Sequence, residues 1–134
     1  MNFLNWRIFK SKKGKFTVLK AERESDLVGY IALRYRIENK IKVGYIFDLY
    51  CLEEEQVLNS LLDSAKDYFK TERISEVKFF IPAHTFYYQK MLRAGFKLED
   101  WKPFTFVSCI FDEEYAKDVL NMDNWFISLL DTDL

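Results

Sequence analysis

The chain has 134 residues, of which 49% are hydrophobic and 18% are aromatic, and its formal net charge is -1. This length suits a single domain with one sizeable core, and the share of rings favours a sheet-rich core. The balanced charge argues against a general nucleic-acid binder, and no apolar run approaches the ~20 residues that a membrane helix needs.

The first part of the chain predicts an antiparallel meander. Apolar runs separated by short polar turns are typical of neighbouring strands. Strands are expected over residues 3–10, 16–21, 27–38 and 41–52. In the third run, side chains at alternate positions share one face: Tyr30, Ala32, Arg34 and Arg36. The fourth run is the longest and most apolar, which indicates a strand covered on both faces.

The apolar period then changes to that of a helix. It is carried by Val57, Leu58, Leu61, Leu62, Ala65, Tyr68 and Phe69. Glu53, Glu54 and Glu55 are expected in its first turn, where carboxylates favour the helix dipole. A short strand over 76–81 stops at Pro82, and a second helix over 84–94 has Gly95 at its C-terminal cap. Later elements are strands over 96–101 and 104–111, a short helix or loop over 113–120, and an edge strand or docked tail over 125–130.

This order of elements predicts an α/β (α+β) fold. A helix between two strands implies a parallel pair with a right-handed crossover, whereas the meander and the last strands are antiparallel. We therefore predict one domain over residues 1–134, with a mixed, largely antiparallel sheet and helices on its faces.

Four segments in this order carry a resemblance to a known family. Residues 27–33 resemble its third strand, and 91–96, with Gly95-Phe96, resemble its last helix-to-strand junction. The family is the GNAT acyltransferase superfamily. Residues 3–7 and 125–133 are similar to the start and end of the second domain in bacterial proteins built from two GNAT-like halves. The resemblance implies the acyl-CoA N-acyltransferase fold without its first strand and first two helices.

The resemblance also implies a cofactor site for acetyl-CoA. In this family the pantetheine arm pairs with the backbone of the central strand, and the pyrophosphate binds at the N-terminus of the next helix, where free N–H groups and the dipole favour anions. Carried over to this chain, the cofactor-binding residues are Leu49, Cys51, Leu52, Gln56 and Val57.

The pyrophosphate loop departs from the family's pattern. That loop reads Gln/Arg-x-x-Gly-x-Gly/Ala, and its glycines let phosphate approach the backbone closely. Here residues 53–58 read Glu-Glu-Glu-Gln-Val-Leu, so that Gln56 and Leu58 fill the glycine positions. The three carboxylates stand where the phosphates would sit, and like charges repel. We therefore expect weakened cofactor binding. In this interpretation, residues 53–58 form the ordinary, acid-capped start of a helix and not a pyrophosphate-binding loop.

Asp48 is the first candidate for a catalytic group. It lies between Phe47 and Leu49 in the most apolar strand. A carboxylate there would take the proton of a substrate amine or pair with its charge. The structural alternative is a bond to the backbone or to an arginine such as Arg34 or Arg36.

Two further catalytic candidates belong to the second helix. The family's general acid is usually a Tyr four residues before the glycine, and here that position is Met91. Tyr88, one turn earlier, is a displaced acid or a packing residue. His84, the single histidine, is a base near neutral pH or an ordinary helix-start residue. It has no cluster of Cys or carboxylates beside it, so no metal site is expected.

The remaining sequence features concern the cellular compartment. Residues 1–13 lack the continuous apolar stretch of a signal peptide, so we expect a cytoplasmic protein. Cys51 and Cys109 lie in apolar runs without a nearby His or CxxC partner. Buried, reduced thiols are expected, with a disulfide or a reactive thiol as the alternative.

Three functional hypotheses follow. The first is a degenerate GNAT-like domain that serves as a binding or interaction module. Because a partial fold exposes a sheet edge and apolar surface, we expect it to form a homodimer or to pair with another GNAT-like domain. The second is an acyl-CoA-dependent N-acetyltransferase that acts on a small amine. The third is a purely structural sheet domain without a small ligand.

Overall fold

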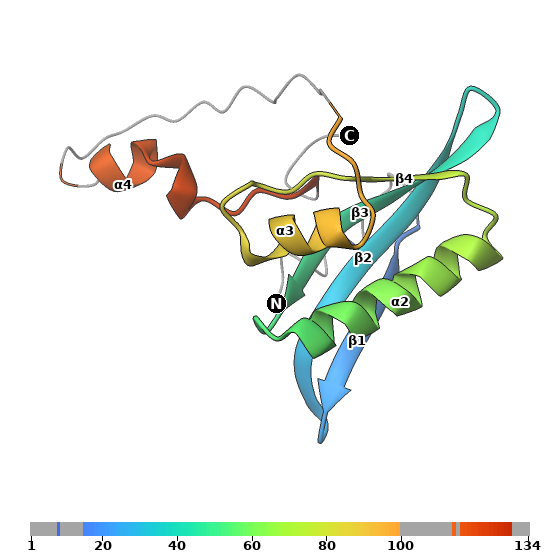
Figure 1. Cartoon of the computed structure of the whole chain (residues 1–134), viewed down its shortest axis with the longest axis horizontal. Helices are drawn as coiled ribbons and strands as arrows, with labels where there is room; N and C mark the ends of the chain where they lie inside the picture. Colours follow the sequence, from blue (N-terminus) through green and yellow to red (C-terminus); the bar gives the residue numbers. More distant parts are fainter. Residues whose placement is uncertain (1–7, 9–14, 100–113, 115, 130–134) are drawn as a thin grey trace. The chain divides into compact units, whose positions relative to one another are not determined.

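The computed structural model describes Ile8, residues 15–99, Glu114 and residues 116–129. The chain divides into two compact units, Met1–Phe80 with Ser128–Leu134, and Ile81–Ile127. In Figure 1 the first unit contains β1 (Thr17–Arg23), β2 (Asp26–Glu38), β3 (Ile41–Cys51), α2 (Glu55–Thr71) and β4 (Glu76–Phe79). The second contains α3 (Phe86–Arg93), α4 (Ala116–Leu120) and the 3-10 helix η3 (Met122–Asn124).

The sheet of the first unit has the order β1-β2-β3-β4. β1 and β2 are antiparallel, as are β2 and β3, whereas β3 and β4 are parallel and are joined through α2. The predicted mixed, largely antiparallel sheet is therefore confirmed. No helix in the described part of the chain is both long and apolar enough to cross a bilayer.

Two-residue turns close both hairpins. Glu24 and Ser25 connect β1 to β2 with φ values of 51° and 77°, and Asn39 and Lys40 connect β2 to β3 with 48° and 71°. Two successive positive φ values are the signature of the turn that matches the twist of paired strands. The turn expected around residues 38–40 is confirmed.

Helix α2 lies along one face of the sheet (Figure 1). Its apolar stripe is buried, as the periodicity predicted: Val57, Leu58, Leu61, Leu62, Ala65 and Phe69. Beneath it the sheet contributes four side chains with at most 1% exposure, Ile31, Leu33, Ile46 and Leu49. Gly44 lets the helix approach, because a Cβ on it would lie 2.7 Å from the ring of Phe69. This contact assigns Gly44 and the residues in phase with it to the α2 face.

The opposite face of the sheet has a different character. Phe16 and Val18 of the β1 side pack with the buried Ile8 and Ala32. The alternation along β2 places Tyr30, Arg34 and Arg36 on this same face, as the sequence predicted. We call it the arginine face.

A bulge in β3 changes which residues reach each face. Ala32 pairs with Asp48 and Leu33 with Ile46, so Phe47 is an extra residue on β3. Its ring lies 5.0 Å from that of Phe16, on the arginine face. Because the extra residue shifts the alternation by one position, Asp48 also belongs to the arginine face. Without the bulge, Asp48 would share the face of Ile46 under α2.

The second unit confirms its predicted helices in shortened form. α3 begins after the N-cap Thr85 and ends before Gly95, whose φ of 97° is that of the expected C-terminal cap. α4 confirms the short helix between 113 and 120.

Several expected strands need correction or cannot be compared. Residues 96–99 are not part of a strand, so the strand expected over 96–101 is wrong for its described part. The segment 125–129 is not a strand either, and the burial of Ser128 and Leu129 fits the docked tail instead. Apart from Ile8, the strands expected over 3–10 and 104–111 lie outside the described residues.

Candidate functional site

Asp48 is the only candidate catalytic carboxylate from the sequence, and it is buried, with 7% exposure. The Tyr30 hydroxyl donates to its Oδ2 at 2.6 Å, and the backbone N–H of Leu49 donates to its Oδ1 at 3.0 Å. Two hydrogen bonds to a carboxylate favour its charged form and offset part of the cost of burial. The alternative raised from the sequence, a hydrogen bond between Asp48 and the backbone, is therefore present.

Tyrosine rings flank this carboxylate on the β2–β3 ladder. Tyr30 pairs with Tyr50 across the strands, and their ring centroids are 6.4 Å apart. Tyr50 is 58% exposed, whereas Asp48 is buried, so the two tyrosines lie between the carboxylate and the surface. A carboxylate bonded by one of two neighbouring tyrosines is a chemistry that suits a cationic amine.

Among the described strands, β4 lies beside only part of the central strand β3. In the described chain β4 pairs with β3 only from Val43 to Ile46. The Leu52 N–H donates to Val28 of β2 at 2.9 Å, so the N–H groups of Leu49 and Cys51 point away from β2, because bonding alternates along an antiparallel strand. This is the stretch of backbone to which the resemblance assigned a pantetheine arm. The Leu49 N–H, however, is already bonded by Asp48.

The cofactor-binding candidates differ in exposure. Leu49 and Cys51 are buried, with exposed fractions of 0% and 2%, whereas Leu52 is 43% exposed. In the first turn of α2, Gln56 is exposed and Val57 is buried. The resemblance assigns cofactor contacts to the backbone of this region, so neither the buried nor the exposed side chains conflict with it.

The N-terminus of α2 begins later than the sequence predicted. Glu54 is the N-cap, and only Glu55 lies in the first turn, with Glu53 before the helix. The first helical bond runs from the Leu58 N–H to the Glu54 carbonyl at 3.2 Å. N–H groups ahead of such a bond have no partner within the helix, which is the usual origin of an anion site.

An ion pair stands beside this helix end. Nη2 of Arg23, the last residue of β1, lies 2.6 Å from Oε2 of Glu54. The hydrogen bond from Arg23 lowers the pKa of Glu54, and the same bond to Glu54 raises the pKa of Arg23. The Glu54 carboxylate is therefore ionised and held near the position that the resemblance assigns to pyrophosphate.

His84 and Tyr88 lie in the second unit. His84 precedes the N-cap of α3, and its Nδ1 is 3.5 Å from Oδ1 of Asp123. Tyr88 is half-buried in the first turn of α3, and Met91 is buried one turn later at 2% exposure. The His84 contact with Asp123 fits the helix-start role as well as that of a base.

The structure thus groups six of the eight candidate residues in the first unit: Asp48, Leu49, Cys51, Leu52, Gln56 and Val57. The other two belong to the second unit. Tyr30 and Arg23 were not among the predicted site residues, because their partners lie 18 and 31 positions away. Among the described residues, no group of three or more His, Cys, Asp or Glu side chains is placed to hold a metal ion.

Comparisons with known proteins bear on the fold. No family model matches the chain, and no curated protein matches it. Among solved structures it is similar to a putative acetyl transferase from Pyrococcus furiosus, at 16% identity, covering 71% of this chain and 68% of that one, with a TM-score of 0.63. It is also similar to the ribosomal-protein-alanine N-acetyltransferase of Brucella melitensis biovar Abortus 2308, at 17% identity, 68% and 70% coverage, and a TM-score of 0.56.

A third likeness is to the aminoglycoside N-acetyltransferase AAC(6')-Iy in complex with CoA, at 15% identity, 76% and 81% coverage, and a TM-score of 0.59. At these identities the likenesses establish the architecture. The described chain has part of the GNAT acyl-CoA N-acyltransferase fold, as the resemblance implied.

Proposed function

We propose that this chain is a GNAT-like domain with a degenerate cofactor loop, and that it works as a binding or interaction module. The Glu54–Arg23 ion pair at the N-terminus of α2 carries the proposal. At that helix end a GNAT enzyme would place the cofactor pyrophosphate, whereas this chain places a carboxylate already neutralised by its own arginine.

Three features of β3 and of the N-terminal end of α2 oppose cofactor binding. A pyrophosphate would meet the charges of residues 53–55, and binding would have to break or rearrange the ion pair. Leu58 fills the second glycine position with a fully buried side chain that belongs to the core. In β3, the Leu49 N–H that points away from β2 is already bonded by Asp48.

The second candidate function is an acyl-CoA-dependent N-acetyltransferase acting on a small amine. It is favoured by the buried Asp48 at the β3 bulge and by the fold shared with acetyltransferases. In that reaction the neutral amine attacks the thioester carbonyl, Asp48 or His84 takes the amine proton, and Tyr88 protonates the departing CoA thiolate. A backbone N–H of β3 would polarise the carbonyl.

Calorimetric titration with acetyl-CoA, and with free CoA in parallel, separates the two functions. We expect no binding by the native chain at micromolar cofactor. Micromolar binding together with turnover of an amine would overturn the degenerate assignment. In that case loss of turnover in Asp48→Asn and in Tyr88→Phe would support the catalytic roles, and unchanged turnover in both would remove them.

The Glu54→Gln variant tests the reason for the expected weakness. If the Glu54 carboxylate competes with phosphate, its removal leaves Arg23 and the helix end available, and cofactor binding increases. The matched control is Asp63→Asn, which removes a carboxylate exposed on the flank of α2. Equal gains in both variants would point to net charge alone.

A partner is part of the proposal. Leu27 and Ile37 of β2 are 62% and 72% exposed, and apolar side chains on a sheet favour association. We propose a homodimer or a complex with another GNAT-like domain, in the cytoplasm. Light scattering at low and high concentration tests the homodimer, and a monomer at both concentrations would exclude it.

A further inference from the structure

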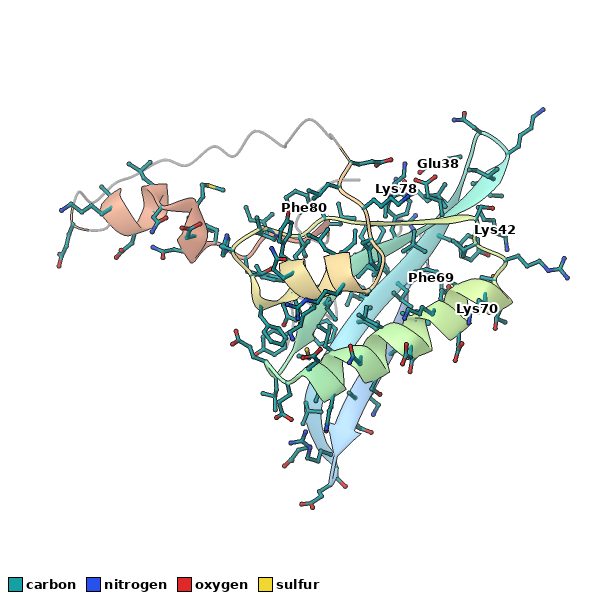
Figure 2. The ribbon with its side chains drawn as sticks, in the orientation of Figure 1. Glu38, Lys42, Phe69, Lys70, Lys78 and Phe80 are labelled. Atoms are coloured by element: carbon teal, nitrogen blue, oxygen red, sulfur yellow. The ribbon has the colours of Figure 1, made fainter. Side chains whose placement is uncertain are left out.

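The segment that contains α4 and η3 exposes apolar side chains along a short stretch of the second unit. Leu120, Met122 and Phe126 are 66%, 49% and 44% exposed. No residue of α4 or of η3 is buried. Figure 2 shows the side chains of α4 projecting away from its ribbon. These two short elements are therefore not held in place by an apolar core of their own.

Polar side chains hold this segment together instead. The indole Nε1 of Trp125 and the side-chain amide of Asn124 donate to backbone carbonyls of α4 at 3.0 and 3.1 Å. The Asn121 side chain accepts a hydrogen bond from the Asp123 N–H at 3.1 Å. The usual arrangement is thus reversed, because polar side chains satisfy the backbone while large apolar side chains face water.

Two contacts join the segment to the start of α3. The ring centroid of Phe126 lies 6.1 Å from that of Tyr87, which is buried. Nδ1 of His84 lies 3.5 Å from Oδ1 of Asp123. Because these contacts support the segment within the second unit, the exposed part of Phe126 is presented from a fixed position.

Acidic side chains accompany the apolar ones. Asp118 in α4 and Asp123 in η3 are both exposed. Exposed apolar side chains that occur together with polar neighbours are typical of a surface that contacts another molecule. We call this surface, made of Leu120, Met122, Phe126, Asp118 and Asp123, the α4–η3 surface.

The charge of this stretch distinguishes the possible occupants. Over residues 112–123 the sequence has five carboxylates and one lysine, whereas the net charge of the whole chain is -1. Twofold pairing of two copies would place the same acidic surface against itself, and like charges repel across an interface. Segments that lie in a membrane interface have Lys and Arg beside their apolar side chains, because membrane surfaces are negative. A basic partner protein fits this surface better than either.

We propose that the α4–η3 surface binds an amphipathic basic segment of a partner protein. Apolar side chains of that segment cover the three exposed apolar residues, and its lysines or arginines pair with the two aspartates. Burial of the apolar area supplies affinity, and the charges select and orient the partner. The side-chain hydrogen bonds within the α4–η3 segment order it before the partner arrives, which lowers the entropy cost of binding.

This inference rests on the proposed role as a binding module, and it adds the chemistry of the partner. The α4–η3 surface belongs to the second unit, whereas Arg23 and Glu54 belong to the first. The acetyl-CoA titration and the peptide titration are separate measurements on separate units, so the failure of one leaves the other standing.

The test uses the full chain and a labelled synthetic peptide in which pairs of Leu alternate with pairs of Lys, followed by fluorescence anisotropy. One comparison peptide has Glu in place of every Lys, and a second has Ser in place of every Leu. We expect binding of the first peptide only. The double variant Leu120→Gln/Met122→Gln should bind it at least about tenfold more weakly, since the apolar contact is lost.

The matched control is Leu27→Gln/Ile37→Gln, which removes two exposed apolar side chains from β2 in the first unit. We expect its affinity for the peptide to stay near that of the native chain.

A second pair of variants tests the charges. Asp118→Asn/Asp123→Asn should weaken peptide binding by about fivefold and make it less sensitive to salt, because exposed ion pairs contribute modestly and are screened. Asp63→Asn/Asp67→Asn removes the same charge from exposed positions on α2 and should leave the affinity unchanged. The first of these variants also serves as the readout if circular dichroism shows that Leu120→Gln/Met122→Gln is unfolded.

Three results would overturn the proposal. One is equal affinity of Leu120→Gln/Met122→Gln and the native chain, and another is equal weakening in the β2 control, which would indicate general hydrophobic adsorption. The third is absence of peptide binding. In that case binding to phosphatidylcholine vesicles would assign the surface to a membrane, and self-association abolished by Leu120→Gln/Met122→Gln would assign it to a second copy.

Discussion

The two faces of the four-stranded sheet have opposite chemistry. Beneath α2, the sheet presents aliphatic side chains such as Ile31 and Leu49 with no exposure. Leu58 on the buried side of the helix is also fully buried. The arginine face presents rings, guanidinium groups, and the Tyr30–Asp48 hydrogen bond. The comparison separates an aliphatic core on one face from rings and charged side chains on the other.

The largest effect is expected under α2. Leu58→Ala removes a fully buried side chain from a packed core, so the free energy of unfolding should fall by about 2–5 kcal/mol. The exposed neighbour Asn59→Ala is the control and should change it little. Urea denaturation measures both. A loss below about 1 kcal/mol in Leu58→Ala would mean that this face is not the main source of stability.

A smaller loss is expected at Asp48. Asp48→Ala leaves the Tyr30 hydroxyl and the Leu49 N–H without their acceptor, which should cost about 1–3 kcal/mol. Adding Tyr30→Phe should recover part of that loss, because the two changes share one hydrogen bond. Strict additivity in the double-mutant cycle would show that the pair is not coupled. Asp63→Ala, exposed on α2, is the control.

Tyr45 makes the arginine face sensitive to alkaline pH. Burial and, secondarily, the hydrogen bond to Glu38 raise its pKa from 10.0 to about 12. A raised folded pKa gives stability that is complete below the unfolded pKa and is lost as pH rises through the folded one. The native chain should therefore lose more stability than Tyr45→Phe between pH 10 and about 12. Phenolate absorbance should show one late-titrating tyrosine that Tyr45→Phe lacks.

The smallest stability effect is expected at the Arg23–Glu54 pair, because both side chains are about half exposed and salt screens them. The bond lowers the folded pKa of Glu54 below 4.5, so its contribution is present above that pH and is lost as pH falls through the lowered value. The difference between the native chain and Glu54→Gln should vanish in acid and in high salt. A difference that persists in both would assign Glu54 a role other than this ion pair.

The local elements of this protein were determined by the sequence. The period-2 runs gave β1 to β3, the helical spacing from Val57 to Phe69 gave α2, and Gly95 marked the end of α3. These patterns are readable because each reflects neighbours within a few positions. The shared face of Arg34 and Arg36 follows from the same alternation.

The tertiary structure alone decided the site. An unbroken alternation would place Asp48 with Ile46 under α2, and one extra residue at Phe47 moves it to the arginine face beside Tyr30. Likewise, the pairing of Glu54 with Arg23 depends on where the end of β1 meets the start of α2. Both contacts join residues far apart in sequence, and their formation depends on strand register and helix packing, which no local pattern encodes.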